Sequence, residues 1–460
     1  MPHAIRRDPT RVLIWYCLSV TLAACTVLFC VRANPDLTDS TRVLATPGGE
    51  SPGPHSGAPA GPAPMIAWRY AESAAAGASG PAVDPQGGLY LSSGGALLAL
   101  RRDGSLRWKR AADNGEDRSL GVPVLDPAGR LLVGMRGRLL AFDTAGRQLW
   151  VHRGQKASAA FSHINIAPSG LTYAVENLRW LHAFSRSGDG LWSRELTILL
   201  SDLRVGPANR VYVVTGGKVV AYNEMGESLW AYRSRAGAFS RIGIGPDGSL
   251  YATGLPGTLA ALGANGYLHW EVAYPGTPPC ANSGITFGPD GTLYIACRGE
   301  VSAYTRDGTR KWHYRLAPPA GEVPQAPVLG PDGTLYLGAD GLRALSAEGH
   351  LSWHVLPPRI GSHPVTAPRA TQVTTSPVIG SDGTIFVGYN DGCVQAVGRD
   401  GNLLWVYSDT HSGGGDRERA RAIRSLHLGG GLVIASGADL VALPLDPPAL
   451  AFDPAATATP

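Results

Sequence analysis

Three residues able to do chemistry, His163, Asp202 and Arg241, occupy the same position in consecutive sequence repeats when the repeats are aligned on their first turn. An imidazole, a carboxylate and a guanidinium can transfer protons, bind a metal or recognise an anion. The set has no nucleophile at matched spacing, and one histidine with one carboxylate offers too few ligands for a metal. Recognition is favoured over catalysis, because a guanidinium presents a planar fork to a carboxylate. The alternative is a structural salt bridge between Asp202 and Arg241, with His163 bonded beside it.

The repeat that positions these residues is defined by alanine, glycine and tryptophan. The pattern Ala-x4-Gly-x3-Trp occurs eight times, and its first copy is Ala99, Gly104 and Trp108. A ninth tryptophan precedes the first copy, and a truncated copy ending at Ala442 follows the last. A repeat of about forty residues with short apolar runs and glycine turns is typical of propeller blades. The nine tryptophans are Trp68, Trp108, Trp150, Trp192, Trp230, Trp270, Trp312, Trp353 and Trp405.

Each repeat predicts four short strands joined by tight turns. In one copy the first strand is expected to end at Phe287, and the others to begin near Thr292, Glu300 and Lys311. Each tryptophan offers a large apolar surface to the next blade, which one sheet alone cannot cover. Open sheet edges are unfavourable, so the Trp68 strand should complete a blade with the C-terminal strands. The sequence predicts an all-β propeller over residues 65–446 with nine blades, or eight if the terminal pieces do not pair.

The N-terminal residues 1–32 predict a signal or anchor segment. Residues 12–31 carry no charge and follow a basic start, and twenty such residues can cross a bilayer as a helix. Within them, Leu22-Ala23-Ala24-Cys25 fits a bacterial lipobox, so Cys25 is a candidate for lipidation. Either anchor, lipid or transmembrane helix, places the body outside the cytoplasm, in the bacterial cell envelope. Residues 33–64 are rich in Pro, Gly, Ser and Ala and predict a flexible linker, and 447–460 a disordered tail.

Charge and cysteine content exclude several functions. The formal net charge is +4, and residues 1–32 contribute three of these charges. The rest of the chain is nearly neutral and lacks the excess of basic residues that nucleic-acid binding requires. Cys280 and Cys297 fall almost opposite each other in a predicted hairpin, within reach of a disulfide in an oxidising compartment. Cys393 would remain alone. No CxxC pair or HExxH motif is present, so no zinc site is expected.

The repeat resembles that of the PQQ-like propeller family, over residues 65–446. The family includes quinoprotein dehydrogenases and non-enzymatic relatives such as the propeller lipoprotein of the outer-membrane β-barrel assembly machinery. The dehydrogenases hold a quinone over calcium with Asp, Glu and Asn ligands, and often carry a vicinal disulfide. This chain has no adjacent cysteines and few carboxylates outside turns. The resemblance therefore implies the non-enzymatic branch, without a cofactor or metal.

Variation between copies concentrates in the connections from one repeat to the next, where binding sites of propellers are expected. The longest holds Arg417, Arg419, Arg421 and Arg424 with two acidic residues, either a solvated loop or a contact for an acidic partner. We expect a monomeric, envelope-anchored scaffold that binds a protein partner. The alternatives are a quinoprotein-like enzyme, and a sensor that binds a small ligand or carbohydrate near His163, Asp202 and Arg241.

Overall fold

The computed structural model describes twelve stretches of the chain, all within the second of its two compact units, Ser51–Pro460. These stretches are 66–70, 80–93, 95–111, 121–135, 137–156, 158–273, 284–297, 299–316, 325–358, 372–408, 422–437 and 439–445. The predicted anchor with Cys25, the linker and the tail lie outside them. Within the described residues, no helix has the length and apolarity needed to cross a membrane.

The described strands form nine four-stranded antiparallel sheets, which we number as blades from the N-terminus. Blades 1 to 3 comprise β2 (Ala82–Val83), β3 (Leu89–Ser93), β4 (Ala96–Leu100), β5 (Leu106–Ala111); β6 (Val124–Leu125), β7 (Arg130–Met135), β8 (Arg138–Asp143), β9 (Gln148–Arg153); and β10 (Phe161–Ile166), β11 (Thr172–Glu176), β12 (Trp180–Phe184), β13 (Gly190–Glu195). Blades 4 to 6 comprise β14 (Leu200–Val205), β15 (Val211–Thr215), β16 (Lys218–Tyr222), β17 (Ser228–Arg233); β18 (Ala238–Ile244), β19 (Leu250–Leu255), β20 (Thr258–Leu262), β21 (Leu268–Ala273); and β22 (Ile285–Phe287), β23 (Leu293–Cys297), β24 (Glu300–Tyr304), β25 (Arg310–Arg315). Blades 7 to 9 comprise β26 (Val328–Leu329), β27 (Leu335–Ala339), β28 (Gly341–Leu345), β29 (Leu351–Val355); β30 (Val378–Ile379), β31 (Ile385–Gly388), β32 (Cys393–Val397), β33 (Leu403–Ser408); and β34 (Ser425–Gly429), β35 (Leu432–Ser436), β36 (Leu440–Pro444) with β1 (Trp68–Tyr70). A 3-10 helix, η1 (Pro207–Asn209), lies in the first turn of blade 4.

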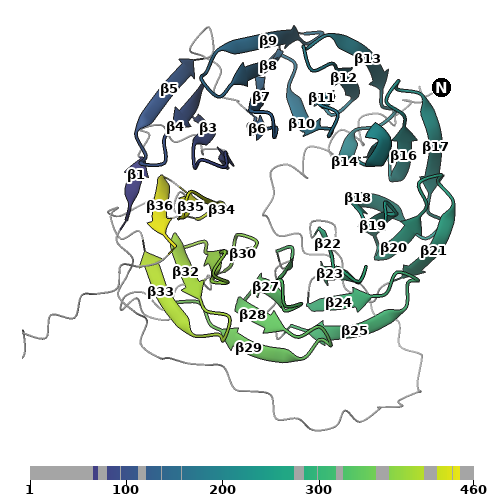
Figure 1. Ribbon diagram of the computed structural model, residues 1–460. Coiled ribbons are helices and arrows are strands. Elements are labelled where there is room, and N and C mark those ends of the chain that lie inside the picture. The colour runs from purple at the N-terminus through teal and green to yellow at the C-terminus, as the bar shows by residue number, and fades with distance from the viewer. Residues whose placement is uncertain are drawn as a thin grey trace, which may run out of the picture. The chain divides into compact units, whose positions relative to one another are not determined.

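The blades are arranged around a common axis, with the first strand of each blade innermost and the last at the outer rim (Figure 1). Successive strands are antiparallel, so the turns after first and third strands lie on one face, which we call the turn face. The connections after the second and fourth strands lie on the opposite face, the loop face. The nine-bladed propeller predicted from the sequence is confirmed.

The turn-face residues explain why the strands reverse where they do. In blade 6, Gly291 adopts a φ of 81°, which residues with a side chain rarely adopt. The carboxylate of Asp290 accepts a hydrogen bond from the backbone N–H of Thr292 at 3.0 Å, and Gly291 N–H donates to Gly288 O at 3.0 Å. The strands of this blade follow the predicted order and boundaries to within a residue or two.

The Ala-x4-Gly-x3-Trp pattern joins each blade to its neighbours. Within a blade the alanine pairs with the tryptophan, as in Ala303↔Trp312. The tryptophan packs over the turn glycine of the next blade, so a Cβ added to Gly308 would lie 2.6 Å from Cδ2 of Trp270. The Trp270 indole N–H donates to the carbonyl of Arg306 in that turn at 2.6 Å. Equivalent bonds are made by Trp68, Trp108, Trp192, Trp230, Trp312 and Trp353.

Blade 9 closes the ring with strands from the two ends of the propeller. The short N-terminal strand β1 pairs with β36, and Trp68↔Ala442 repeats the alanine–tryptophan register of the other blades. Arg69 then donates to the hydroxyl of Tyr407 in blade 8 at 2.9 Å and forms an ion pair with Asp439 at 3.3 Å. The predicted joint between the chain ends is therefore present, and it is built from apolar packing, strand pairing and charge.

The interface between blades 2 and 3 departs from this pattern. The carbonyl of Arg186, equivalent to the acceptors used by the other tryptophans, accepts a hydrogen bond from Nη1 of Arg130 at 2.8 Å. The indole N–H of Trp150 is buried and has no hydrogen-bond partner. Arg130 itself is buried, with a carboxylate oxygen of Asp126 at 2.9 Å from its Nε. A hydrogen bond from the buried Arg130 thus replaces the indole hydrogen bond at this interface, while Trp150 still packs over Gly188.

Candidate functional site

The innermost strands of blades 3, 4 and 5 differ from most of the others. β10, β14 and β18 span six or seven residues, whereas β2, β6, β22, β26 and β30 span two or three. Each of the three long strands also contains a bulge, between Ser162 and Asn165, Leu200 and Asp202, and Phe239 and Arg241. Bulges redirect side chains and are frequent beside binding sites. His163, Asp202 and Arg241 all lie at these bulges, on the loop-face half of their strands.

Asp202 is buried, with an exposed fraction of 1%. It lies at the centre of a group that also contains His163, Arg204 and Arg241, which we call the Asp202 cluster. Its carboxylate accepts hydrogen bonds from the backbone N–H of Leu203 at 2.9 Å and of Ile242 at 3.0 Å. The second bond crosses from blade 4 to blade 5. Its ion pair is made with Arg204, whose Nη1 lies 3.1 Å from Oδ1, rather than with the Arg241 suggested by the aligned positions. Asp202 therefore fixes the spacing of two inner strands.

His163 lies beside this carboxylate in a strained conformation. Its φ of 49° is rare for a residue with a side chain, and such strain persists where the surroundings impose it. The Ser162 hydroxyl donates to Nδ1 of His163 across 3.0 Å if the proton is on Nε2. Burial lowers the pKa of His163 from 6.5; the charge of Asp202 raises this pKa, and those of Arg241 and Arg204 lower it. The imidazole is consequently neutral at pH 7.

Arg204 is the member of the cluster that the aligned positions did not reveal. It stands two residues after Asp202 on β14, and alternate residues of a strand share a face. This i, i+2 relation was the available signal. The guanidinium is 46% exposed, while the carboxylate it contacts is 2% exposed, so one side of the Arg204 guanidinium faces solvent.

A connection between blades 3 and 4, the 196–200 loop, presents apolar side chains on the loop face. Ile198 is 54% exposed and Leu199 is 40% exposed. The backbone of this loop is nevertheless held at both ends, by Leu196 N–H donating to Arg179 O at 2.7 Å and Leu200 N–H donating to Leu178 O at 2.8 Å. The Ile198 carbonyl also accepts a hydrogen bond from the Thr215 hydroxyl. Exposed apolar side chains on a fixed backbone are typical of binding surfaces.

The remaining candidate residues lie elsewhere. Arg424 is exposed immediately before β34 in blade 9, apart from the inner strands of blades 3 to 5. Arg417, Arg419 and Arg421 lie outside the described residues, as does Cys280. Cys297 is disulfide-bonded, whereas Cys393 is a buried free thiol. The pairing of Cys297 with Cys280 stays a prediction.

The arrangement suits recognition better than turnover. Ser162 and His163 form a hydroxyl–imidazole pair, but the carboxylate of Asp202 is bound by Arg204 and two backbone N–H groups and does not orient the imidazole. Within the twelve described stretches, no group of three or more His, Cys, Asp or Glu side chains is placed to hold a metal ion.

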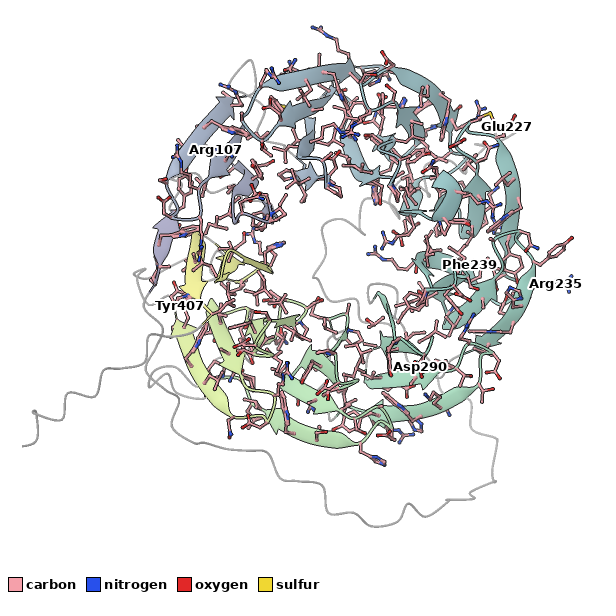
Figure 2. The ribbon with its side chains drawn as sticks, in the orientation of Figure 1. Arg107, Glu227, Arg235, Phe239, Asp290 and Tyr407 are labelled. Atoms are coloured by element: carbon pink, nitrogen blue, oxygen red, sulfur yellow. The ribbon has the colours of Figure 1, made fainter. Side chains whose placement is uncertain are left out.

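Figure 2 shows the inner position of Phe239, which begins the β18 bulge, relative to Arg235 and Glu227 at the outer rim.

Comparison with known proteins supports the fold and defines the family. Residues 65–177 and 255–446 match the family model described as outer membrane protein assembly factor BamB. No curated protein matches the chain in sequence. The C-terminal WD40 domain of Sif2 aligns with 12% identity and a TM-score of 0.51, covering 68% of this chain and 92% of its own. This likeness shows the propeller fold alone.

Two further solved structures are similar at lower scores. BamB from Moraxella catarrhalis has 17% identity and a TM-score of 0.45, with 79% of this chain and 92% of that chain covered. A streptogramin B lyase has 14% identity and a TM-score of 0.43, with 59% and 93% covered. The family model, by contrast, matches more than half of the chain. Between its two matched segments lies the unmatched stretch 178–254, which holds Asp202, Arg204 and Arg241. The chain belongs to the family of the outer membrane protein assembly factor BamB.

Proposed function

We propose that this protein is a scaffold of the bacterial cell envelope that holds a protein partner on the loop face of blades 3 to 5. The observation that carries the proposal is the 196–200 loop, in which Ile198 and Leu199 are exposed while the backbone is fixed. Such a surface loses little conformational freedom on binding, so apolar burial contributes to affinity with little opposing entropy. Membership of the family supports a role in the assembly of envelope proteins.

The proposed location follows from the same chain. A lipid on Cys25 or a helix over residues 12–31 would hold the propeller at a membrane and outside the cytoplasm. The mechanism is display: the propeller keeps the 196–200 loop and the Asp202 cluster in one arrangement, and the partner binds both. No reaction step is required of the protein.

The test compares two pairs of exposed apolar residues in the full-length protein. Ile198→Ser with Leu199→Ser removes the proposed contact, while Leu191→Ser with Leu229→Ser removes side chains that are 49% and 44% exposed on the outer strands. Cross-linked affinity purification from detergent-solubilised envelopes should recover a stoichiometric protein with the wild type and the outer-rim variant, and lose it with the loop variant. Equal recovery from both variants would refute the proposed surface.

A further inference from the structure

A cavity of about 390 Å³ lies between blades 1 and 2. It runs from Met135 and Arg138, where β7 leads into β8 near the loop face, to Gly146 and Arg147 in the turn between β8 and β9. The outer strands of these blades, β5 and β9, follow one another along the rim (Figure 1). The cavity is therefore separate from the inner strands of blades 3 to 5.

The walls of this cavity are of two kinds. The apolar wall is formed by four buried side chains of one hydrophobic cluster, Leu97, Met135, Leu140 and Phe142. The polar wall contains three arginines, Arg110, Arg138 and Arg147, and the described residues that line the cavity include no aspartate or glutamate. Small-molecule sites commonly have this size and combine apolar walls with a few polar groups. A ligand that matches both walls has an apolar part and a negative charge.

Arg110 on β5 is the arginine best placed to hold that charge. Its Nε donates to the carbonyl of Gly146 at 2.8 Å, across the interface between the two blades. Within the described part of the chain its terminal N–H groups have no acceptor, and the side chain is exposed. The Gly146 bond therefore orients the guanidinium and leaves its terminal N–H groups available to an anion. Arg147, whose Nε lies 3.1 Å from Asp143 Oδ2, adds an exposed charge at the turn-face end.

The interface between blades 4 and 5 shows what fits against this position. The residue two after the repeat tryptophan is Arg110 in blade 1 and Tyr232 in blade 4. The residue one after the tryptophan of the following blade is Val151 in blade 2 and Glu271 in blade 5. The Tyr232 hydroxyl donates to Glu271 Oε2 at 2.7 Å, so a carboxylate of the chain itself bridges blades 4 and 5. Between blades 1 and 2, an aliphatic side chain takes the place of that carboxylate.

We propose that the cavity between blades 1 and 2 binds a small amphipathic carboxylate, of the class of medium-chain fatty acids. The carboxylate accepts hydrogen bonds from the terminal N–H groups of Arg110, and the apolar chain packs against Leu140 and Phe142. The ligand thus supplies the group that Glu271 supplies between blades 4 and 5. This site is independent of the proposed scaffold function, because it involves other blades and a small molecule.

The experiment measures binding of octanoate to the full-length protein in lipid nanodiscs, with empty nanodiscs as the blank. Fluorine NMR of octanoate bearing a terminal trifluoromethyl group reports the bound fraction. The variants are Arg110→Gln, Arg110→Lys and Val151→Glu. Arg194→Gln is the matched control, because Nε of Arg194 donates to the carbonyl of Gly226 at 2.7 Å between blades 3 and 4, and neither residue lines the cavity.

We expect octanoate to bind the wild type and Arg194→Gln with the same affinity, and Arg110→Gln about tenfold more weakly, because a hydrogen bond to a charged group is lost. Arg110→Lys should weaken binding less, since it keeps the charge and loses the planar fork. Val151→Glu should abolish binding, because the new carboxylate pairs with Arg110 as Glu271 pairs with Tyr232. A thermal midpoint for Val151→Glu no lower than that of the wild type would show that this loss is not caused by unfolding.

Neutral and short analogues decide whether both walls are used. Octanol should bind the wild type more weakly than octanoate does, and should bind Arg110→Gln as well as the wild type. Octanol that binds the wild type as tightly as octanoate would overturn the role of the carboxylate. Acetate that binds as tightly as octanoate would reduce the cavity to a site for any small anion and overturn the role of the apolar wall.

The remaining outcomes concern the site itself. Absence of saturable octanoate binding by the wild type, or an equal loss in Arg110→Gln and Arg194→Gln, would overturn the inference. Octanoate binding should be unchanged in the Ile198→Ser, Leu199→Ser variant, so loss of a protein partner in that variant and loss of octanoate in Arg110→Gln are separate results. The failure of either proposal therefore leaves the other standing.

Discussion

Gly308 and Gly333 provide a direct measure of how much the tryptophan contact between blades contributes to stability. Both glycines lie in turn-face turns and have nearly the same backbone, with φ of 87° and 82°. A Cβ on Gly308 would lie 2.6 Å from Cδ2 of Trp270, whereas a Cβ on Gly333 would meet nothing within 4 Å. The two alanine variants therefore share the cost of a left-handed residue and differ in the clash with the indole.

The expected losses follow from these two terms. A left-handed alanine costs about 1–2 kcal/mol, which is the whole effect expected of Gly333→Ala. Overpacking against Trp270 adds about 1–3 kcal/mol, so Gly308→Ala should lower the free energy of unfolding by about 2–5 kcal/mol. The bond from the indole N–H to the Arg306 carbonyl, 2.6 Å long, would be stretched by the same displacement.

Urea unfolding at pH 7.5, followed by tryptophan fluorescence and by far-UV circular dichroism, measures both variants. Coincident transitions would justify the conversion of midpoints into free energies. Trp270→Phe in the Gly308→Ala background should recover part of the loss, because the smaller ring leaves room for the methyl group. Equal losses in the two glycine variants would refute the reasoning that the glycine is required by the neighbouring indole.

Three further predictions concern charge, pH and ring closure. Arg130→Gln should lower the free energy of unfolding by about 3–5 kcal/mol, because it leaves a buried carboxylate unpaired. Arg147 forms an i,i+4 ion pair of similar length with Asp143, but its side chain is 79% exposed. Arg147→Gln should therefore lower the free energy of unfolding by less than about 1 kcal/mol, and thermal unfolding of the two variants tests this contrast. Burial holds the pKa of His182 below 6.5, despite Glu176 at 3.1 Å, so the unfolded chain takes up the proton first. The stability contributed by a neutral His182 is fully present above about pH 6.5 and is lost as the pH falls toward the pKa of His182 in the folded protein. Urea midpoints at pH 7.5 and 5.5 should therefore differ less in His182→Gln than in the wild type, and an unchanged difference would contradict the assignment. Trp68→Ala should remove the closing contact with the Gly104 turn, cost about 3–5 kcal/mol, and accelerate amide exchange in β36 more than in β20; equal exchange would argue that the ring does not depend on this joint.

The fold could be predicted in detail because its determinants are local and repeated. The spacing of alanine, glycine and tryptophan fixes which residues of the third and fourth strands pair, as in Ala442↔Trp68 at the ring closure. Turn glycines with positive φ mark the strand reversals. Each blade contacts only its neighbours, so correct assignment of one repeat predicts the others.

The candidate site was only partly predictable. Alignment of the repeats finds His163, Asp202 and Arg241, but the bulges that direct their side chains depend on pairing between strands. The ion pair of Asp202 with Arg204 is a choice between two nearby guanidinium groups that spacing does not decide. The exposure of Ile198 and Leu199 also depends on tertiary structure, because Leu200 in the same apolar run is buried.

The direction of β1 determines how the propeller is presented. As the fourth strand of blade 9, β1 runs from the turn face toward the loop face, so the chain enters the ring beside the turns at Ile66. Any tether that precedes Ile66 is thus joined on the opposite face from the 196–200 loop and the Asp202 cluster. Such a protein has its tether and its proposed binding surface on opposite faces. A partner can therefore reach the binding surface without meeting the tether.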